Sequence, residues 1–193
     1  MEYIHNFKID PLTIVSNNWK RPFDKEQYFT KYIPEWQSIF TQDFLDVFKD
    51  HIKVAMVFNK PTNWNETSKG NSVHVDEGDI ICAMNIVLPT TDNLSLMEWF
   101  HTDIDHKELL IGSNSNYAAR WNGENAWTQK RFQLLHQSHV DNTSTLVRVD
   151  VPHRVVVSRG ARVCISVRFK EKFTVWSDAV TYVESLFQEL HHK

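Results

Sequence analysis

Short runs of apolar and β-branched residues dominate the chain from residue 52 onward, and several alternate with polar residues as half-buried β-strands do. The first run, Ile52–Phe58, is rich in β-branched residues. Turn sequences such as Glu77-Gly78-Asp79 and Ser158-Arg159-Gly160 separate several of the later runs. The later runs are Val73–Asp76, Ile80–Leu88, Leu94–Phe100, Phe132–His139, Thr145–Val149, Arg154–Val157 and Arg162–Phe169. Their succession predicts a mainly β fold, an antiparallel barrel or sandwich of the jelly-roll type.

Two segments have the apolar period of amphipathic helices, one on each side of the predicted strands. The first covers Glu35 to Asp50, and the second covers Ser177 to His191, with Ser177 as its expected N-cap. No low-complexity tract or linker divides the chain, so we expect a single domain. Its expected parts are an N-terminal support of helical and irregular structure (1–51), a β core (52–170) and a C-terminal helix (176–192).

Composition and charge exclude several classes of protein. Of the 193 residues, 41% are apolar, and no run approaches the ~20 apolar residues of a membrane span. The 21 basic residues are outnumbered by 24 acidic ones, which argues against a binder of nucleic acids or anionic membranes. Cys82 and Cys164 lie in apolar runs without zinc-site spacing, so we expect reduced, buried thiols. The first residues show no secretory signal, and the expected location is the cytoplasm.

A His-x-Asp sequence at the end of a strand aims an imidazole and a carboxylate at the same point, because residues i and i+2 share a face. One distant histidine would complete a 2-His-1-carboxylate triad, which binds ferrous iron and leaves coordination positions open. His74-Val75-Asp76 has the best context of the candidate pairs. It ends a strand-like run, is followed by a glycine turn, and leads into the long run Ile80–Leu88.

Two other His-x-Asp sequences remain alternatives. His101-Thr102-Asp103 opens a long polar insert at 102–131, a length typical of functional or mobile loops. His139-Val140-Asp141 reads more simply as a surface loop. His139 is also a rival for the distant histidine, because Arg148 follows it by nine residues just as Arg162 follows His153.

The third ligand is marked by the strand that follows it. His153 precedes the run Arg162–Phe169, in which every second residue from Val163 is apolar. The other face of this run carries Arg162, Cys164, Ser166 and Arg168. If that face lines a barrel mouth, Arg162 and Ser166 form a clamp for a carboxylate, since the planar guanidinium binds a carboxylate through two hydrogen bonds. The pattern leaves open whether Arg168 reaches a substrate or solvent.

Together, His74-x-Asp76, His153, and Arg162 with Ser166 resemble the Fe(II)/2-oxoglutarate-dependent dioxygenases, in particular the prolyl-4-hydroxylase-like branch. The sequence from Cys82 to Pro89, followed by Trp99-Phe100, is similar to small oxygenase-like proteins of phages and marine bacteria. The resemblance covers roughly residues 52–170. It implies a double-stranded β-helix, the jelly-roll architecture that cupins also have.

The resemblance also implies roles for individual residues. His74, Asp76 and His153 would bind Fe(II), Arg162 would pair with the distal carboxylate of 2-oxoglutarate, and Ser166 would support it. Asn85 would contact the co-substrate, although it reads equally well as an ordinary strand residue. The tyrosine with which this family often binds 2-oxoglutarate has no counterpart between Tyr32 and Tyr117.

The function implied is that of a dioxygenase that uses O2 and 2-oxoglutarate, hydroxylates a substrate, and releases succinate and CO2. The substrate, a small molecule or a protein, is not identified by the sequence. One alternative is a cupin-like metal enzyme that uses the same three ligands without 2-oxoglutarate. The other is a non-enzymatic β-sandwich with a binding or structural role.

Overall fold

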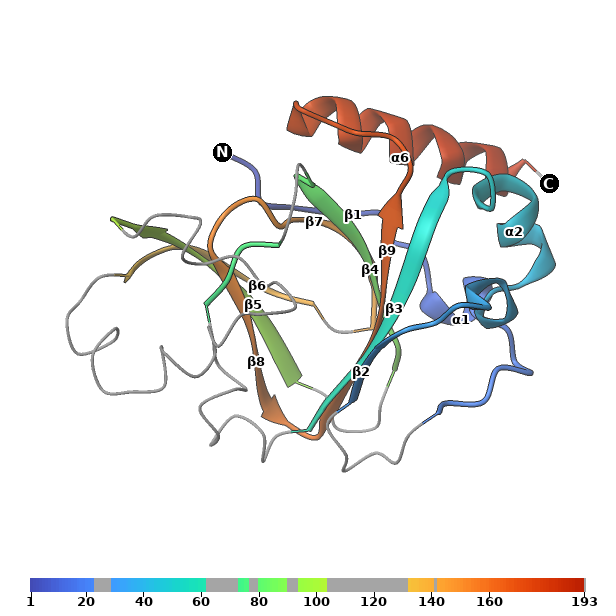
Figure 1. Cartoon of the computed structure of the whole chain (residues 1–193), viewed down its shortest axis with the longest axis horizontal. Coiled ribbons are helices and arrows are strands. Elements are labelled where there is room, and N and C mark those ends of the chain that lie inside the picture. Colours follow the sequence, from blue (N-terminus) through green and yellow to red (C-terminus); the bar gives the residue numbers. More distant parts are fainter. Residues whose placement is uncertain are drawn as a thin grey trace.

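Two antiparallel β-sheets and a few flanking helices make up the described structure (Figure 1). The computed structural model describes residues 1–22, 29–61, 73–76, 80–89, 94–103, 132–140 and 142–192. The predicted turn at 77–79, residues 104–131 of the polar insert, and Asp141 lie outside the described residues. The helical elements are α1 (Pro11–Ile14), the 3-10 helix η1 (Trp36–Ile39), α2 (Gln42–Phe48) and α6 (Trp176–His191).

The larger sheet has six strands and the smaller has three. Across the larger sheet the order is β1 (Ile4–Asn6), β7 (Ser144–Arg148), β4 (Cys82–Val87), β9 (Ala161–Phe169), β3 (Ile52–Pro61) and β2 (Phe29–Tyr32). Across the smaller sheet the order is β6 (Phe132–His139), β5 (Leu94–Thr102) and β8 (His153–Arg159). The sequence prediction of a mainly β fold with flanking helices is confirmed, and the arrangement is consistent with a β-sandwich.

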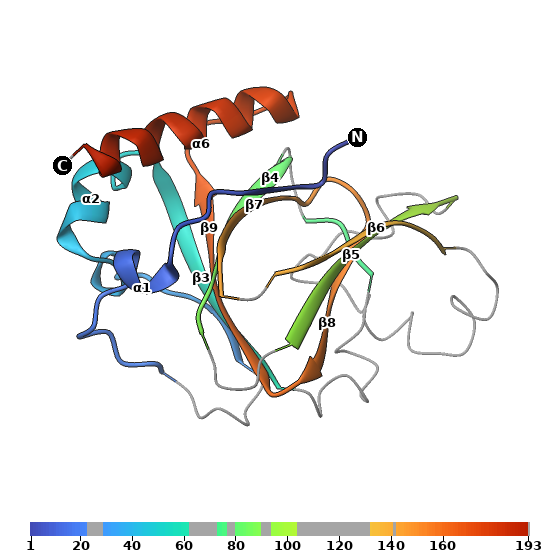
Figure 2. The same ribbon diagram turned by 180° about the vertical axis from the view of Figure 1, so that it is seen from behind.

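Alternation along β9 sends its side chains into two different environments. Val163, Ile165 and Val167 belong to a hydrophobic core that also contains residues of α2 and α6. Both helices lie on that outer side of the larger sheet (Figure 2). The residues between them, starting with Arg162, point to the inner face, toward the smaller sheet. Burying the apolar face under the helices therefore fixes the polar face of β9 on the inside.

A second, smaller core joins the two sheets. Ala83 of β4 and Val147 of β7 lie in it with Met97 and Trp99 of β5. The indole Nε1 of Trp99 donates a hydrogen bond to the carbonyl of Arg148, 2.9 Å away. These contacts hold the inner faces of the sheets together on one side and leave the polar residues of β9 on the other.

The helix predicted over Glu35–Asp50 is two elements rather than one. Phe40 has extended backbone angles (φ −103°, ψ 158°) and forms a bridge with Val15, so η1 ends there and α2 begins after Thr41. The aromatic stripe continues across the break, and the rings of Phe44 and Phe48 stack with centroids 4.2 Å apart. Tertiary pairing with Val15 overrides local helical preference at this point.

Three further details correct the sequence expectations. The C-terminal helix begins at Trp176, after the extended backbone of its N-cap Val175, so Ser177 lies inside the first turn and its hydroxyl donates to Asp178. The segment Val73–Asp76 forms an isolated bridge in place of a full strand. The N-terminal support supplies two edge strands, β1 on β7 and β2 on β3, which its irregular pattern did not predict.

In the part of the chain described, no helix is long and apolar enough to span a membrane.

Candidate metal centre

Backbone pairing brings the three predicted ligands together at the edge of the smaller sheet. The amides and carbonyls of His74 and His153 exchange hydrogen bonds of 2.8 and 2.9 Å, so the two residues lie directly opposite each other. The amide of Asp76 donates to the carbonyl of Val149 at 3.0 Å, which holds the segment along its length. His74 and Asp76 are two residues apart on an extended segment, so both side chains turn to the side where the His153 ring lies.

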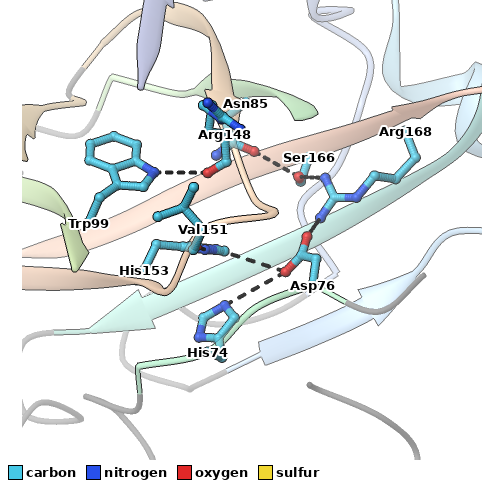
Figure 3. Close-up of polar contacts among 9 residues, drawn as sticks. All are labelled: His74, Asp76, Asn85, Trp99, Arg148, Val151, His153, Ser166 and Arg168. Atoms are coloured by element: carbon cyan, nitrogen blue, oxygen red, sulfur yellow. Dashed lines mark hydrogen bonds and ion pairs between the residues drawn. The ribbon is translucent and has the colours of Figure 1, made fainter. Parts of the chain in front are cut away.

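The three side chains surround one point (Figure 3). Oδ1 of Asp76 lies 3.8 Å from Nε2 of His74 and 3.9 Å from Nε2 of His153. One potential ligand atom from each of the three residues lies within 4.8 Å of the others. Adjacent ligands of an octahedral or tetrahedral transition metal, each about 2.1 Å from the ion, are about 3.0–3.4 Å apart, so small side-chain shifts would bring these atoms to ligand spacing. The predicted His–Asp–His set is therefore close enough to bind a metal ion.

The protonation of His153 suits this role. The residue is only 3% exposed, and burial, with His74 nearby, lowers its pKa to about 3, so the ring is neutral at neutral pH. Its Nδ1 lies 2.8 Å from the carbonyl of Val151, and because a carbonyl can only accept, Nδ1 carries the proton. The lone pair is then on Nε2, which faces Asp76. Two electron-rich atoms facing each other favour a cation between them.

Asp76 is held as a carboxylate by its neighbours. Burial alone raises its pKa, but the Arg168 guanidinium and the two imidazoles outweigh burial and hold the pKa below its usual value. Arg168 Nη2 donates to Oδ2 of Asp76, the oxygen that does not face the histidines. The arginine thus orients the carboxylate and leaves Oδ1 directed toward the two rings.

Arg168 is itself fixed by a chain of hydrogen bonds on the inner face. Its Nη1 donates to the Ser166 hydroxyl at 2.6 Å, and that hydroxyl donates to Oδ1 of Asn85 at 2.7 Å. Asn85 and Ser166 are register partners on β4 and β9. The structure therefore places Ser166 in contact with Arg168 at the end of β9 next to the candidate metal ligands, and Asn85 in contact with Ser166. Four residues of extended strand, about 13 Å, separate Ser166 from the predicted clamp partner Arg162.

Arg162 lies at the other end of the same face. It is 5% exposed, and its Nε and Nη2 have no hydrogen-bond partner among the described residues. Its neighbours on this face are the Cys164 thiol, whose pKa is raised mainly by burial, and Lys60, its register partner on β3. Sequence analysis identified Arg162 but missed Lys60, because only the pairing of β3 with β9 reveals that the two residues are neighbours.

The rival candidates lie elsewhere. His101 and Asp103 are both exposed near the end of β5, and His139 is exposed at the end of β6. Arg148, the rival for the predicted clamp, is engaged by its own neighbour, with Nη2 2.5 Å from Oδ2 of Asp150. Among the described residues only His74, Asp76 and His153 meet as a set of potential metal ligands.

Comparison with known proteins places the chain in no family. Neither a protein-family model nor a curated protein matches the sequence. The crystal structure of AviO1 from Streptomyces viridochromogenes Tue57 is similar at a TM-score of 0.35 and 14% identity, over 62% of this chain and 50% of AviO1. The chain thus spans about half the length of that protein, and a likeness at this level supports no conclusion on family or activity.

Proposed function

We propose that this protein is an Fe(II)- and 2-oxoglutarate-dependent oxygenase built on a double-stranded β-helix. The observation that supports it most directly is the convergence of His74, Asp76 and His153 on one point between two antiparallel sheets. Two histidines with one carboxylate are the ligand set of non-haem Fe(II) oxygenases, in which the remaining coordination positions take co-substrate and dioxygen.

The strand order supports the proposed architecture. In the larger sheet β9 lies between β3 and β4, and in the smaller sheet β5 lies between β6 and β8. The bridge from His74 to His153 adds the segment 73–76 beside β8. Consecutive segments of the core thus alternate between the two sheets for much of their length, as in a jelly roll.

The inner face of β9 supports the use of a dicarboxylate co-substrate. Its metal end carries Arg168, which is occupied by Asp76 and Ser166, and its other end carries the buried guanidinium of Arg162. A buried donor without a partner costs free energy, and a ligand carboxylate would remove that cost. Arg162 would hold the distal carboxylate of 2-oxoglutarate, while the three ligands hold Fe(II).

Each residue has a defined task in this proposal. When bound, Fe(II) supplies activation of dioxygen, coupled to conversion of 2-oxoglutarate into succinate and CO2 and to hydroxylation of a substrate still to be identified. Neutral His153 presents Nε2, Asp76 supplies the negative charge, and Arg168 keeps its carboxylate from turning. The rest of the site fixes positions and limits access of water.

Succinate formation tests the proposal. Purified protein with Fe(II), ascorbate and 2-oxoglutarate should produce succinate slowly even without added substrate, and His74→Ala should abolish it. Arg159→Met, an exposed arginine on β8, is the matched control and should leave the rate unchanged. Saturable Mn(II) binding without any succinate would favour the cupin-like alternative. No saturable metal binding would favour the non-enzymatic β-sandwich.

A further inference from the structure

The inner face of the larger sheet places two like charges side by side where β3 pairs with β9. Lys60 and Arg162 are direct register partners, and the Cβ atoms of such a pair are about 4.5–5.5 Å apart. Like charges in this position destabilise a sheet. Arg162 is buried, so its side chain does not relieve the repulsion by reaching solvent, and two of its nitrogens have no hydrogen-bond partner among the described residues.

Lys60 is held in this position by the neighbouring sheet. Its Nζ donates to the carbonyl of Val155 on β8, which ties the lysine to the strand that carries His153. Burial, followed by the charges of Arg162 and Arg154, lowers the pKa of Lys60 to about 7. Lys60 thus exchanges a proton near neutral pH.

Among the described residues, the other charged groups near Lys60 supply no negative charge that compensates the pair. Arg154 of β8 is engaged by Glu98 of β5, with Nε 2.6 Å from Oε2. Lys31 of β2 is the register partner of Val57 and therefore lies on the opposite face of the sheet. The neighbouring thiol of Cys164 is neutral, because burial raises its pKa. The described surroundings of Lys60 and Arg162 thus carry an excess of positive charge.

We propose that Lys60 and Arg162 form one two-cation site for the distal carboxylate of the co-substrate, and that Lys60 takes up a proton when the dicarboxylate binds. This inference rests on the proposed function and assigns it a second recognition residue. A carboxylate between the two cations removes their repulsion and stabilises the protonated lysine, so the affinity for 2-oxoglutarate falls as the pH rises. If Lys60 remains protonated in the complex, linkage gives a loss of up to about 25-fold between pH 6.5 and 8.5.

Calorimetry with saturating Mn(II), under exclusion of oxygen, tests this. Wild type, Lys60→Met and Lys60→Arg are titrated with 2-oxoglutarate at pH 6.5, 7.5 and 8.5. We expect Lys60→Met to bind about tenfold more weakly at pH 6.5, without the wild-type pH dependence. Lys60→Arg, always charged, should hold its affinity up to pH 8.5. Lys31→Met on the neighbouring strand is the control and should behave as wild type.

A second ligand distinguishes binding at the two-cation site from chelation of the metal. 2-Oxobutyrate keeps the keto acid that chelates the metal but lacks the distal carboxylate, so Lys60→Met should bind it as wild type does. Equal affinity and equal pH dependence for 2-oxoglutarate in wild type and Lys60→Met would overturn the two-cation site and leave the proposed function standing. Failure of the wild type with Mn(II) to bind 2-oxoglutarate at all would overturn both.

Discussion

Each end of the inner face of β9 carries an arginine, and the two arginines differ in their hydrogen-bond partners. At one end Arg168 is satisfied, because it donates to Asp76 and Ser166. At the other end Arg162 is buried and lies opposite Lys60, and two of its nitrogens have no hydrogen-bond partner in the described part of the chain. An ion pair that is complete within the chain serves positioning, whereas an uncompensated buried charge calls for a ligand of opposite charge. In the proposed function, one strand thus provides both a rigid support for the candidate metal ligands and a binding site for an anion.

The largest expected effect is the loss of stability when Arg168 is replaced by methionine. Without metal, Arg168→Met should lower the free energy of unfolding by about 3–5 kcal/mol, because it leaves the Asp76 carboxylate buried without its cation. Saturating Mn(II) should reduce this loss, since the ion takes over the charge compensation. Urea denaturation with and without Mn(II) measures both values, and Arg159→Met is the exposed control. An unchanged stability would show that Arg168 does not support the carboxylate.

Removing the negative charge at the metal end should affect metal binding next most strongly. Asp76→Asn should weaken Mn(II) binding at least about 100-fold, more than loss of an outer-shell partner does. A Mn(II) titration monitored by electron paramagnetic resonance, which detects the free ion, gives the affinity. Asp103→Asn, in the rival His-x-Asp sequence, should bind Mn(II) as wild type does. Equal weakening by both variants would argue against the assigned triad.

At the Arg162 end of β9, substitution should lower the affinity for 2-oxoglutarate without lowering the stability of the fold. Arg162→Met removes a buried charge that no described acidic side chain compensates, so the variant's free energy of unfolding should be unchanged or higher. Its affinity for 2-oxoglutarate in the presence of Mn(II) should fall about 10- to 100-fold, the value of a charged hydrogen bond. Mn(II) affinity itself should not change. A variant that is strongly destabilised yet binds 2-oxoglutarate normally would reverse the comparison between the two arginines.

The smallest expected effect is the pH dependence of the free energy of unfolding in the metal-free protein. The folded pKa of His153 is about 3 and the ordinary value is 6.5, so below pH 6.5 the unfolded state binds a proton that the folded state does not. Stability therefore falls with falling pH, by about 2 kcal/mol from this residue between pH 7 and pH 5. Urea denaturation in EDTA at both pH values measures it. His153→Gln should lose that part of the dependence, whereas His139→Gln on the exposed edge should keep it.

Much of the β core was predictable because strand periodicity is local. The run Arg162–Phe169 shows in its own residues that one face is apolar and the other polar, and β9 has this alternation. The convergence of His74 and Asp76 was predictable for a similar reason, since His-x-Asp at a strand end specifies two side chains on one face. The break at Phe40 was not predictable, because the stripe of aromatic residues continues through it and only the bridge to Val15 ends the helix.

The sequence by itself therefore determined which residues share a face of a strand. On β9 it determined that the polar side chains from Arg162 to Arg168 lie on one face. Only the tertiary structure decided which neighbours those side chains meet. Pairing of β3 with β9 placed Lys60 opposite Arg162, and the bridge between His74 and His153 placed Asp76 within reach of Arg168. The physical reason is that side-chain direction follows from backbone period within one strand, whereas charge compensation depends on strands distant in sequence.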